Sequence, residues 1–304
     1  MKMILEMFWA VVAASTGFLR SAPDYESSLD SQLLMGTVAC VDKTQGYWCH
    51  VNAMEPAYSG WINDLQLSIK TEDQIQAYID APKYICTADF SHVFEAPSAG
   101  SGRICGIVMG EIVRRTGRSA GTWKEVLLPD DRTGWMESAD VECFEEWART
   151  RKPDAENLVS VASRFMGCTY MWGGASIKYV DCSGLVRNVY YMNGLLLPRD
   201  ASQQVKLGLA LPLDMSGWQV GDLLFFGTPA SGGKPMRVSH VAMYIGNGRI
   251  IHSSKVVRVN SLVPGEPDYY ERPVIAARRM LGQEGKDGGP VRIQECPWYF
   301  KQQK

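Results

Sequence analysis

The sequence predicts an α+β protein in which two small all-β domains precede a mixed α+β domain. The first half repeats short apolar stretches broken by Gly, Pro, Asp and Ser, which is typical of small barrels. The second half places a cysteine at the start of an expected helix and two histidines on an expected hairpin. We expect domains over residues 9–75, 82–146 and 153–304. The last domain includes an aromatic tail, Trp298–Phe300, which we expect to dock on the body of the protein.

The size and composition fit a chain with several folded domains. Of its 304 residues, 46% are hydrophobic, which is enough to bury a full core. A formal net charge of −2 gives no general attraction for nucleic acid or anionic membranes. The eight cysteines have no tight repeated spacing, so we expect most of them to be reduced. We expect a monomer with no nucleic-acid partner.

The repeat in the first half has an offset of 74 or 75 residues. Its matches, with the first copy before the second, are Ala22-Pro23 and Ala96-Pro97, Met35-Gly36 and Met109-Gly110, Trp48 and Trp123, Val51 and Val126, and Gly60-Trp61 and Gly134-Trp135. Five matches in one register argue against a chance repeat of common dipeptides. We therefore predict two copies of one small barrel.

The first fifteen residues, Met1–Ser15, look at first like a short secretory signal with a small-residue cleavage site. However, Val11–Ala14 aligns with Ile85–Ala88 of the second copy, which favours a first barrel strand that cleavage would delete. Glu6 also interrupts the apolar run, which is far shorter than the ~20 residues of a transmembrane helix. We expect no functioning signal and no membrane span. This favours a cytoplasmic location, or the periplasm or cell envelope if the true start lies upstream.

Cys182 is the candidate nucleophile. It opens a segment with apolar residues at helical spacing from Leu185 to Tyr190, with Asp181 as the expected N-cap and Gly194 as the expected stop. A thiol in the first turn faces unpaired backbone N–H groups and the positive end of the helix dipole. With a neighbouring imidazolium, its pKa can fall to roughly 3.5–7.5. Its backbone N–H is also a candidate oxyanion donor.

His240 and His252 lie on the two arms of the predicted hairpin. A two-residue turn, Asn247-Gly248, would place them on opposite faces, because side chains alternate along a strand. We therefore predict a three-residue loop, Gly246–Gly248, which pairs Ala242 with His252 and brings both histidines to one face. His240 is then the candidate base, and His252 is the candidate residue that orients it.

Each of these residues also has a simpler interpretation. The thiol can be a buried structural cysteine, and the histidines can be hydrogen-bonded polar groups on a sheet. A helix-opening cysteine and a same-face histidine pair must then coincide by chance, which favours nucleophilic catalysis. A zinc site is a further alternative, but no fourth ligand lies nearby at metal-site spacing. We predict a thiol hydrolase that needs no metal and no organic cofactor.

Five motifs of the second half occur in a recognisable order. They are Tyr170–Gly174 (Tyr-Met-Trp-Gly-Gly), Asp181–Leu185 (Asp-Cys-Ser-Gly-Leu), Leu197–Gln204, Val220–Phe226 and Ser239–Gly246. In this order they resemble the NlpC-type cell-wall peptidases, over roughly residues 153–280. The two barrels resemble bacterial SH3 domains, and the whole chain resembles the dipeptidyl-peptidase VI, or YkfC-like, branch. The resemblance implies a papain-like core, in which a helical part with the cysteine packs on an antiparallel sheet with the histidines.

The resemblance also implies roles for individual residues. It makes Cys182 the nucleophile, His240 the base and His252 the orienting residue. Further implied positions are the oxyanion-side hydroxyl Tyr170, the substrate-side residues Trp172 and Ser202, and, from the first barrel, Tyr58 and an acidic partner for which Glu26 is one candidate.

The substrate that the resemblance implies is a peptidoglycan stem peptide with a free amino-terminal L-alanine. The bond cut would join γ-D-glutamate to the diamino acid, in murein peptide turnover or recycling. A site that demands a free ammonium needs a carboxylate and oriented acceptors, and Asp181 and Ser183 flank the nucleophile. Asp181 has the alternative role of capping the helix. Diaminopimelate and lysine both stay open as the diamino acid.

Other functions stay open at this point. One is a non-catalytic wall-binding protein. The presence of all three candidate catalytic residues, Cys182, His240 and His252, argues against it. Another is an acyltransferase or lipid amidase on a related, circularly rearranged core. Two observations argue against it: the chain has two SH3-like units, and its cysteine precedes the histidines. A third is a broad wall endopeptidase, which would cut intact peptidoglycan and free tripeptide at equal rates.

Overall fold

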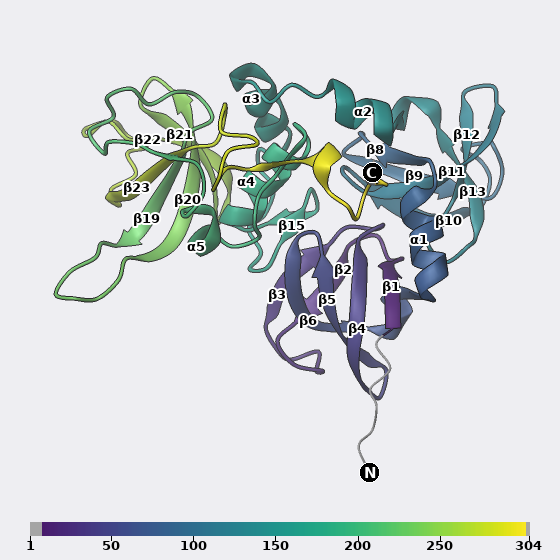
Figure 1. Ribbon diagram of the computed structural model, residues 1–304. Helices are drawn as coiled ribbons and strands as arrows, with labels where there is room; N and C mark the ends of the chain where they lie inside the picture. Colours follow the sequence, from purple (N-terminus) through teal and green to yellow (C-terminus); the bar gives the residue numbers. More distant parts are fainter. Residues whose placement is uncertain (1–7, 302–304) are drawn as a thin grey trace, which may run out of the picture. The chain divides into compact units, whose positions relative to one another are not determined.

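The computed structural model describes residues 8–301, and the chain divides into two compact units. Unit 1 comprises Met1–Thr150 and Gln294–Lys304, and unit 2 comprises Arg151–Ile293. In Figure 1 the strands of unit 1 are purple and blue, and the large sheet of unit 2 is green. The combination of all-β domains with a mixed α+β domain confirms the predicted fold class.

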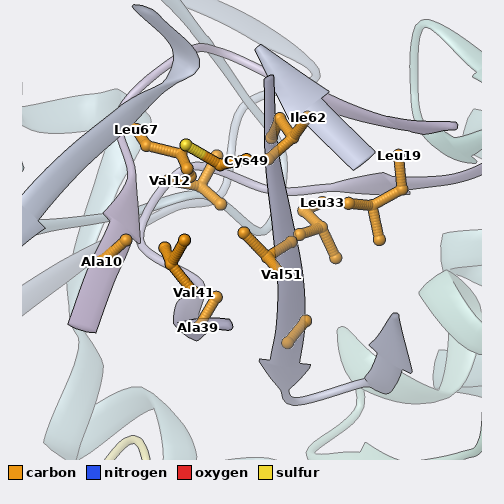
Figure 2. Packing of buried hydrophobic residues seen from close by; sticks show 11 residues of the cluster. Ala10, Val12, Leu19, Leu33, Ala39, Val41, Cys49, Val51, Ile62 and Leu67 are labelled. Carbon is orange, nitrogen blue, oxygen red and sulfur yellow. The ribbon is translucent and has the colours of Figure 1, made fainter. Parts of the chain in front are cut away.

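Unit 1 begins with a seven-stranded antiparallel sheet in the order β3-β2-β6-β5-β4-β1-β7. Its strands are β1 (Phe8–Val12), β2 (Gly17–Arg20), β3 (Leu29–Leu33), β4 (Val38–Gln45), β5 (Trp48–Met54), β6 (Ala57–Asn63) and β7 (Leu67–Lys70). Because side chains alternate along a strand, Cys49, Val51 and Ala53 of β5 all enter one core. Figure 2 shows this core, in which Cys49 and Val51 lie among apolar side chains of the other strands, such as Leu19 and Leu33.

The second barrel repeats the first in sequence and in topology. Its strands are β8 (Lys83–Cys86), β9 (Phe90–Phe94), β10 (Arg103–Val108), β11 (Ile112–Ala120), β12 (Trp123–Leu127), β13 (Thr133–Glu137) and β14 (Val141–Cys143). Their order, β10-β9-β13-β12-β11-β8-β14, equals that of the first barrel with every strand number raised by seven. This confirms the internal repeat. It also confirms Val11 as part of a first strand, whereas Met1–Met7 lie outside the described residues.

Helix α1 (Glu72–Asp80) joins the two barrels. Thr71 caps it in a reciprocal capping box with Gln74. Its buried face, which includes Ile75 and Tyr78, packs against Val11 of β1. The shorter helical elements of unit 1 are η1 (Asp64–Gln66), η2 (Ser138–Asp140) and α2 (Phe144–Thr150), and η3 (Ile293–Glu295) begins at the last residue of unit 2.

The aromatic tail belongs to unit 1, not to the third domain in which the sequence analysis had placed it. Trp298 packs on the cluster of α1 and β1, with its ring centroid 5.6 Å from that of Trp9. Phe300 stacks on Phe144 of α2 at 4.8 Å. The expected docking of the tail on the body of the protein is therefore confirmed, and its anchor is the pair of barrels.

Unit 2 is built on a six-stranded antiparallel sheet in the order β18-β23-β19-β20-β21-β22. These strands are β18 (Leu209–Ala210), β19 (Leu223–Thr228), β20 (Arg237–Gly246), β21 (Arg249–Ser254), β22 (Val256–Ser261) and β23 (Val274–Arg279). Unit 2 also contains two separate two-stranded sheets, namely β15 (Ala175–Ser176) with β16 (Tyr179–Val180) and β17 (Leu195–Leu196) with β24 (Val291–Arg292).

The helices of unit 2 are α3 (Ala155–Arg164), α4 (Cys182–Tyr191) and α5 (Ala201–Gln204). Helix α4 is buried along almost its whole length and packs against β20 and β21. This packing brings the first turn of α4 to the strands that carry the two histidines. Among residues 8–301, no helix is long and apolar enough to cross a membrane.

Candidate active site

Cys182 is the first residue of α4, and Asp181 is its N-cap, as the sequence predicts. The Asp181 carboxylate accepts a hydrogen bond from the Gly184 N–H at 2.7 Å, which satisfies one of the unpaired donors of the first turn. Gly184 is required by packing, because a Cβ there would lie 2.1 Å from the carbonyl oxygen of Gly174. The Asp-Cys-Ser-Gly motif therefore fixes both the start of the helix and its close approach to the preceding loop.

Arg199 is buried beside this motif, with 1% of its surface exposed. Its two terminal nitrogens donate to the two oxygens of Asp181 at 3.1 and 2.6 Å, and one of them also donates to Ser183 Oγ at 3.0 Å. Asp181 further accepts from the N–H of Gly173 at 3.1 Å and from Ser183 Oγ at 3.1 Å. These contacts fill the roughly four lone-pair sites of a carboxylate.

These contacts argue against the expected role of Asp181 as the partner of the substrate ammonium. Its charge is already compensated by Arg199, so a substrate ammonium would have to compete with a buried guanidinium. Ser183 is likewise buried within the same network. Contact of either residue with substrate stays a prediction, whereas their function in fixing the start of α4 follows from the contacts.

The environment of the Cys182 thiol opposes ionisation. Although part of the side chain stays accessible, burial and the neighbouring Asp181 raise the pKa of Cys182 to about 11. The backbone N–H groups of Val241 and Ser183, and the charge of Arg199, lower it to a smaller extent. The expected depression of the thiol pKa is therefore wrong, because burial and Asp181 outweigh the groups that lower the pKa of Cys182.

His240 and His252 share one face of the sheet, as predicted. His240 Nε2 lies 2.7 Å from His252 Nδ1, and both rings are buried. Burial, together with His252 and Arg272, lowers the pKa of His240 to about 3. Burial also lowers the pKa of His252. Both rings are therefore neutral at pH 7.

The loop of the hairpin differs from the predicted one. β20 ends at Gly246 and β21 begins at Arg249, so the turn has two residues, Asn247 and Gly248, both with positive φ. The register shifts at Ile245, which forms a bulge between the Tyr244 and Gly246 pairs. This extra residue compensates for the shorter turn, because a bulge reverses the alternation of side chains along one strand. The histidines share a face for this reason and not through a three-residue loop.

Asn260 of β22 is a neighbour of the histidine pair that the sequence analysis missed. Its side-chain oxygen lies 2.9 Å from His252 Nε2, and its amide nitrogen donates to the Asp268 carbonyl at 2.5 Å. Tyr270 also covers the pair, with its ring edge-to-face against His252 at 4.8 Å. The only sequence signal for Asn260 is that it is a polar residue on the strand after His252. This does not distinguish Asn260 from the other polar residues on strands.

The remaining predicted site residues of unit 2 lie at different depths. Tyr170 is half-buried, and burial together with the charges of Cys182 and Asp181 raises the pKa of its hydroxyl to about 12. It therefore stays protonated and can donate a hydrogen bond near the thiol. Trp172 is 67% exposed, and Ser202 is exposed on α5. A contact of these two with substrate stays a prediction.

Tyr58 and Glu26 belong to unit 1. Tyr58 lies on β6, opposite Ala53 of β5, and packs against the core of the first barrel. Glu26 is exposed in the segment between β2 and β3. Their role at the substrate stays a prediction.

The raised thiol pKa gives a testable pH dependence. Below a pKa of about 11, the thiolate fraction of Cys182 rises with pH, so alkylation by iodoacetamide should accelerate about tenfold per pH unit between pH 7 and pH 9. The measurement is the labelling rate of the Cys182 peptide by mass spectrometry, with Cys182→Ala as the control for the other cysteines. A rate that is already constant from pH 6 would contradict this, because it would indicate a preformed thiolate–imidazolium pair.

The fold and the site together define the class of protein. A helix-opening thiol that packs against a sheet with a hydrogen-bonded histidine pair is the arrangement of papain-like cysteine hydrolases. The chain matches the sequence profile of the NlpC/P60 family over residues 167–279, and that of the bacterial dipeptidyl-peptidase SH3 domain over residues 19–67. It belongs to the NlpC/P60 family.

Individual relatives extend the similarity over most of the chain. The γ-D-glutamyl-L-lysine dipeptidyl-peptidase of Bacillus cereus is 29% identical over 263 residues, which cover 84% of this chain and 76% of the relative. Dipeptidyl-peptidase 6 of Lysinibacillus sphaericus is 28% identical over 86% of this chain and 94% of its own length. The murein DD-endopeptidase MepS/murein LD-carboxypeptidase of Escherichia coli K12 is 30% identical over 54% of this chain and 85% of its own.

A solved structure shows the same fold. It is that of an NlpC/P60 family protein from Bacillus cereus ATCC 10987, with a TM-score of 0.74 and 24% sequence identity. The match covers 89% of this chain and 99% of that one. The predicted family and architecture are therefore confirmed.

Proposed function

We propose that this protein is a cysteine peptidase that hydrolyses the bond between γ-D-glutamate and the diamino acid in peptidoglycan stem peptides with a free amino-terminal L-alanine. The observation that carries the chemical part is the 2.7 Å bond between His240 and His252, on strands that pack against α4, the helix that Cys182 opens. The substrate part is supported by the relatives named γ-D-glutamyl-L-lysine dipeptidyl-peptidase and dipeptidyl-peptidase 6.

In the first step, Cys182 is the nucleophile and His240 is the general base. Because the raised pKa of Cys182 and the lowered pKa of His240 keep the thiol and the imidazole neutral, the thiol proton moves to His240 as the sulfur attacks the scissile carbonyl. Negative charge then develops on the carbonyl oxygen. The backbone N–H of Cys182 and the protonated hydroxyl of Tyr170 are the donors that we assign to it.

In the second step, the tetrahedral intermediate collapses. The C–N bond breaks, His240 returns its proton to the leaving amine of the diamino acid, and a thioester with the γ-D-glutamyl group remains on Cys182. Water then attacks the thioester while His240 takes its proton, and the thiol is regenerated. His252 orients His240 throughout and stabilises its protonated form.

The proposed enzyme reads the free end of its substrate. A buried ammonium must be paired, and acylation of that amine removes a charge-assisted hydrogen bond worth about 1.5–3 kcal/mol. Free stem peptides should therefore be cut roughly ten- to a hundredfold faster than the same peptides with a muramyl group on L-alanine. The measurement is kcat/KM for both substrates, with products identified by mass spectrometry.

The matched substrates are L-Ala-γ-D-Glu-diaminopimelate, its L-lysine counterpart and the muramyl-linked form of each. A single new dipeptide, L-Ala-D-Glu, is the expected product, and the ratio of the two free-peptide rates identifies the preferred diamino acid. Equal rates on intact peptidoglycan and on free tripeptide would replace the proposal with a broad endopeptidase. Asp181→Asn is a poor test, since it removes the negative charge that pairs with the buried guanidinium of Arg199.

A further inference from the structure

We propose that Asn260 is a positioning residue that sets the tautomers of both histidines and leaves Nδ1 of His240 as the nitrogen that receives the thiol proton. The role in proton transfer rests on the proposed cysteine peptidase function. The tautomer assignment itself rests only on the hydrogen bonds of unit 2.

The orientation of the Asn260 amide is fixed by a group that can only accept. The Asp268 carbonyl oxygen lies 2.5 Å from Asn260 Nδ2, so the NH₂ group must face it and the side-chain oxygen must face His252. The loop that supplies this carbonyl is held in turn, because the Ser261 N–H donates to the same Asp268 carbonyl and the Tyr270 N–H donates to the Ser261 carbonyl. The Asp268 carboxylate also pairs with Arg249 of β21.

The orientation of Asn260 determines which ring nitrogen carries the proton, first in His252 and then in His240. Asn260 Oδ1 accepts from His252, so Nε2 of His252 carries a hydrogen. Because His252 is neutral, its Nδ1 is bare and can only accept. The 2.7 Å contact therefore requires a hydrogen on His240 Nε2. In a neutral ring this leaves His240 Nδ1 as the proton acceptor.

This order matters because a histidine with the wrong nitrogen protonated cannot act as a base toward the thiol. Without Asn260, the His252 proton has no fixed acceptor on this side. His252 could then carry its hydrogen on Nδ1 and turn it toward His240, which would reverse the proton on His240. Asn260 is 7% exposed, so no bulk water replaces its oxygen readily.

Tautomers can be read without substrate. In the full chain with ¹⁵N-labelled histidine, long-range ¹H–¹⁵N spectra distinguish a protonated Nε2 from a protonated Nδ1. We expect both His240 and His252 of the wild type to be protonated at Nε2 at pH 7, and an Nδ1-protonated population to appear in Asn260→Ala. His240→Gln and His252→Gln assign the signals.

The activity of variants provides the second readout. Asn260→Ala should lower kcat/KM about ten- to a hundredfold, the range typical of residues that orient a histidine through its second nitrogen. Asn260→Gln keeps both an acceptor for His252 and a donor for the Asp268 carbonyl, and it should recover part of that loss together with the wild-type tautomers. The matched control is Asn193→Ala, since Asn193 is equally buried and donates to the Val189 carbonyl at 2.8 Å.

Several outcomes would overturn the inference. A wild type with His240 protonated at Nδ1 would refute the assignment, and so would an Asn260→Ala variant with unchanged tautomers and kcat/KM within about twofold of the wild type. If Asn260→Ala does not fold by circular dichroism, wild-type tautomers in Asn260→Gln support the inference and altered ones refute it. A wild type that cuts no stem peptide but shows the expected tautomers would refute the proposed function and leave the role of Asn260 intact.

Discussion

Replacing Cys182 by alanine is expected to abolish peptide hydrolysis while the fold stays intact, and His240→Ala should do nearly the same. The sulfur forms the covalent bond to the substrate and His240 moves every proton, so no neighbouring group can take over either step. Loss of a nucleophile or base in such a unit costs at least about 10³-fold in kcat. The measurement is product formation by mass spectrometry, with circular dichroism as the check on folding.

The residue that orients the base should behave differently. His252→Ala should lower kcat less than His240→Ala does, because it removes a hydrogen bond to the base and not the proton carrier. Two controls match the chemistry of the substitutions. Cys168→Ala removes another thiol of unit 2, bonded to the Ile177 carbonyl, and His92→Ala removes a histidine of the second barrel. Normal hydrolysis by Cys182→Ala would end the thiol mechanism.

The two barrels could be predicted because their signals lie in the sequence itself. Short apolar stretches and a repeat with an offset of 74 or 75 residues can be read from the sequence without tertiary structure, and they led to two barrels that share one strand order. The tail could not be placed in the same way. Trp298 and Phe300 are apolar in any context, and only the tertiary structure shows that their partners are Trp9 and Phe144.

The site was predicted as a set of residues but not as an electrostatic environment. The shared face of the histidines depends on the bulge at Ile245, which strand alternation alone does not predict, whereas the helix start at Cys182 follows from capping. The direction of the Cys182 pKa shift could not be predicted from the sequence, because it depends on how deeply the start of α4 is buried. Arg199 illustrates the same point, since its partnership with Asp181 spans 18 positions and depends on how the loop after β17 folds back.

The second large effect that we expect is a loss of stability when Glu111, between the two barrels of unit 1, is replaced. Glu111 of the second barrel is fully buried, and its carboxylate accepts from the backbone N–H groups of Thr16 and Met35 in the first barrel, at 2.9 and 3.3 Å. It also accepts from Ser15 Oγ and from the Val108 N–H. The repeat places Thr37 at the corresponding position of the first barrel, so the barrel fold itself does not require a glutamate there.

Glu111→Ala should therefore destabilise unit 1 by about 3–5 kcal/mol, because it leaves buried donors of both barrels without an acceptor and each unmet donor costs roughly 1–3 kcal/mol, with partial relaxation. Urea unfolding followed by tryptophan fluorescence measures this loss. The control is Glu137→Ala on β13, an exposed glutamate that should change stability by no more than about 0.5 kcal/mol. Glu111→Gln should fall between the two, since one amide oxygen can still accept while the NH₂ group faces donors. A loss below about 1 kcal/mol in Glu111→Ala would show that water or a shifted backbone satisfies these groups, and that the joint does not depend on this carboxylate.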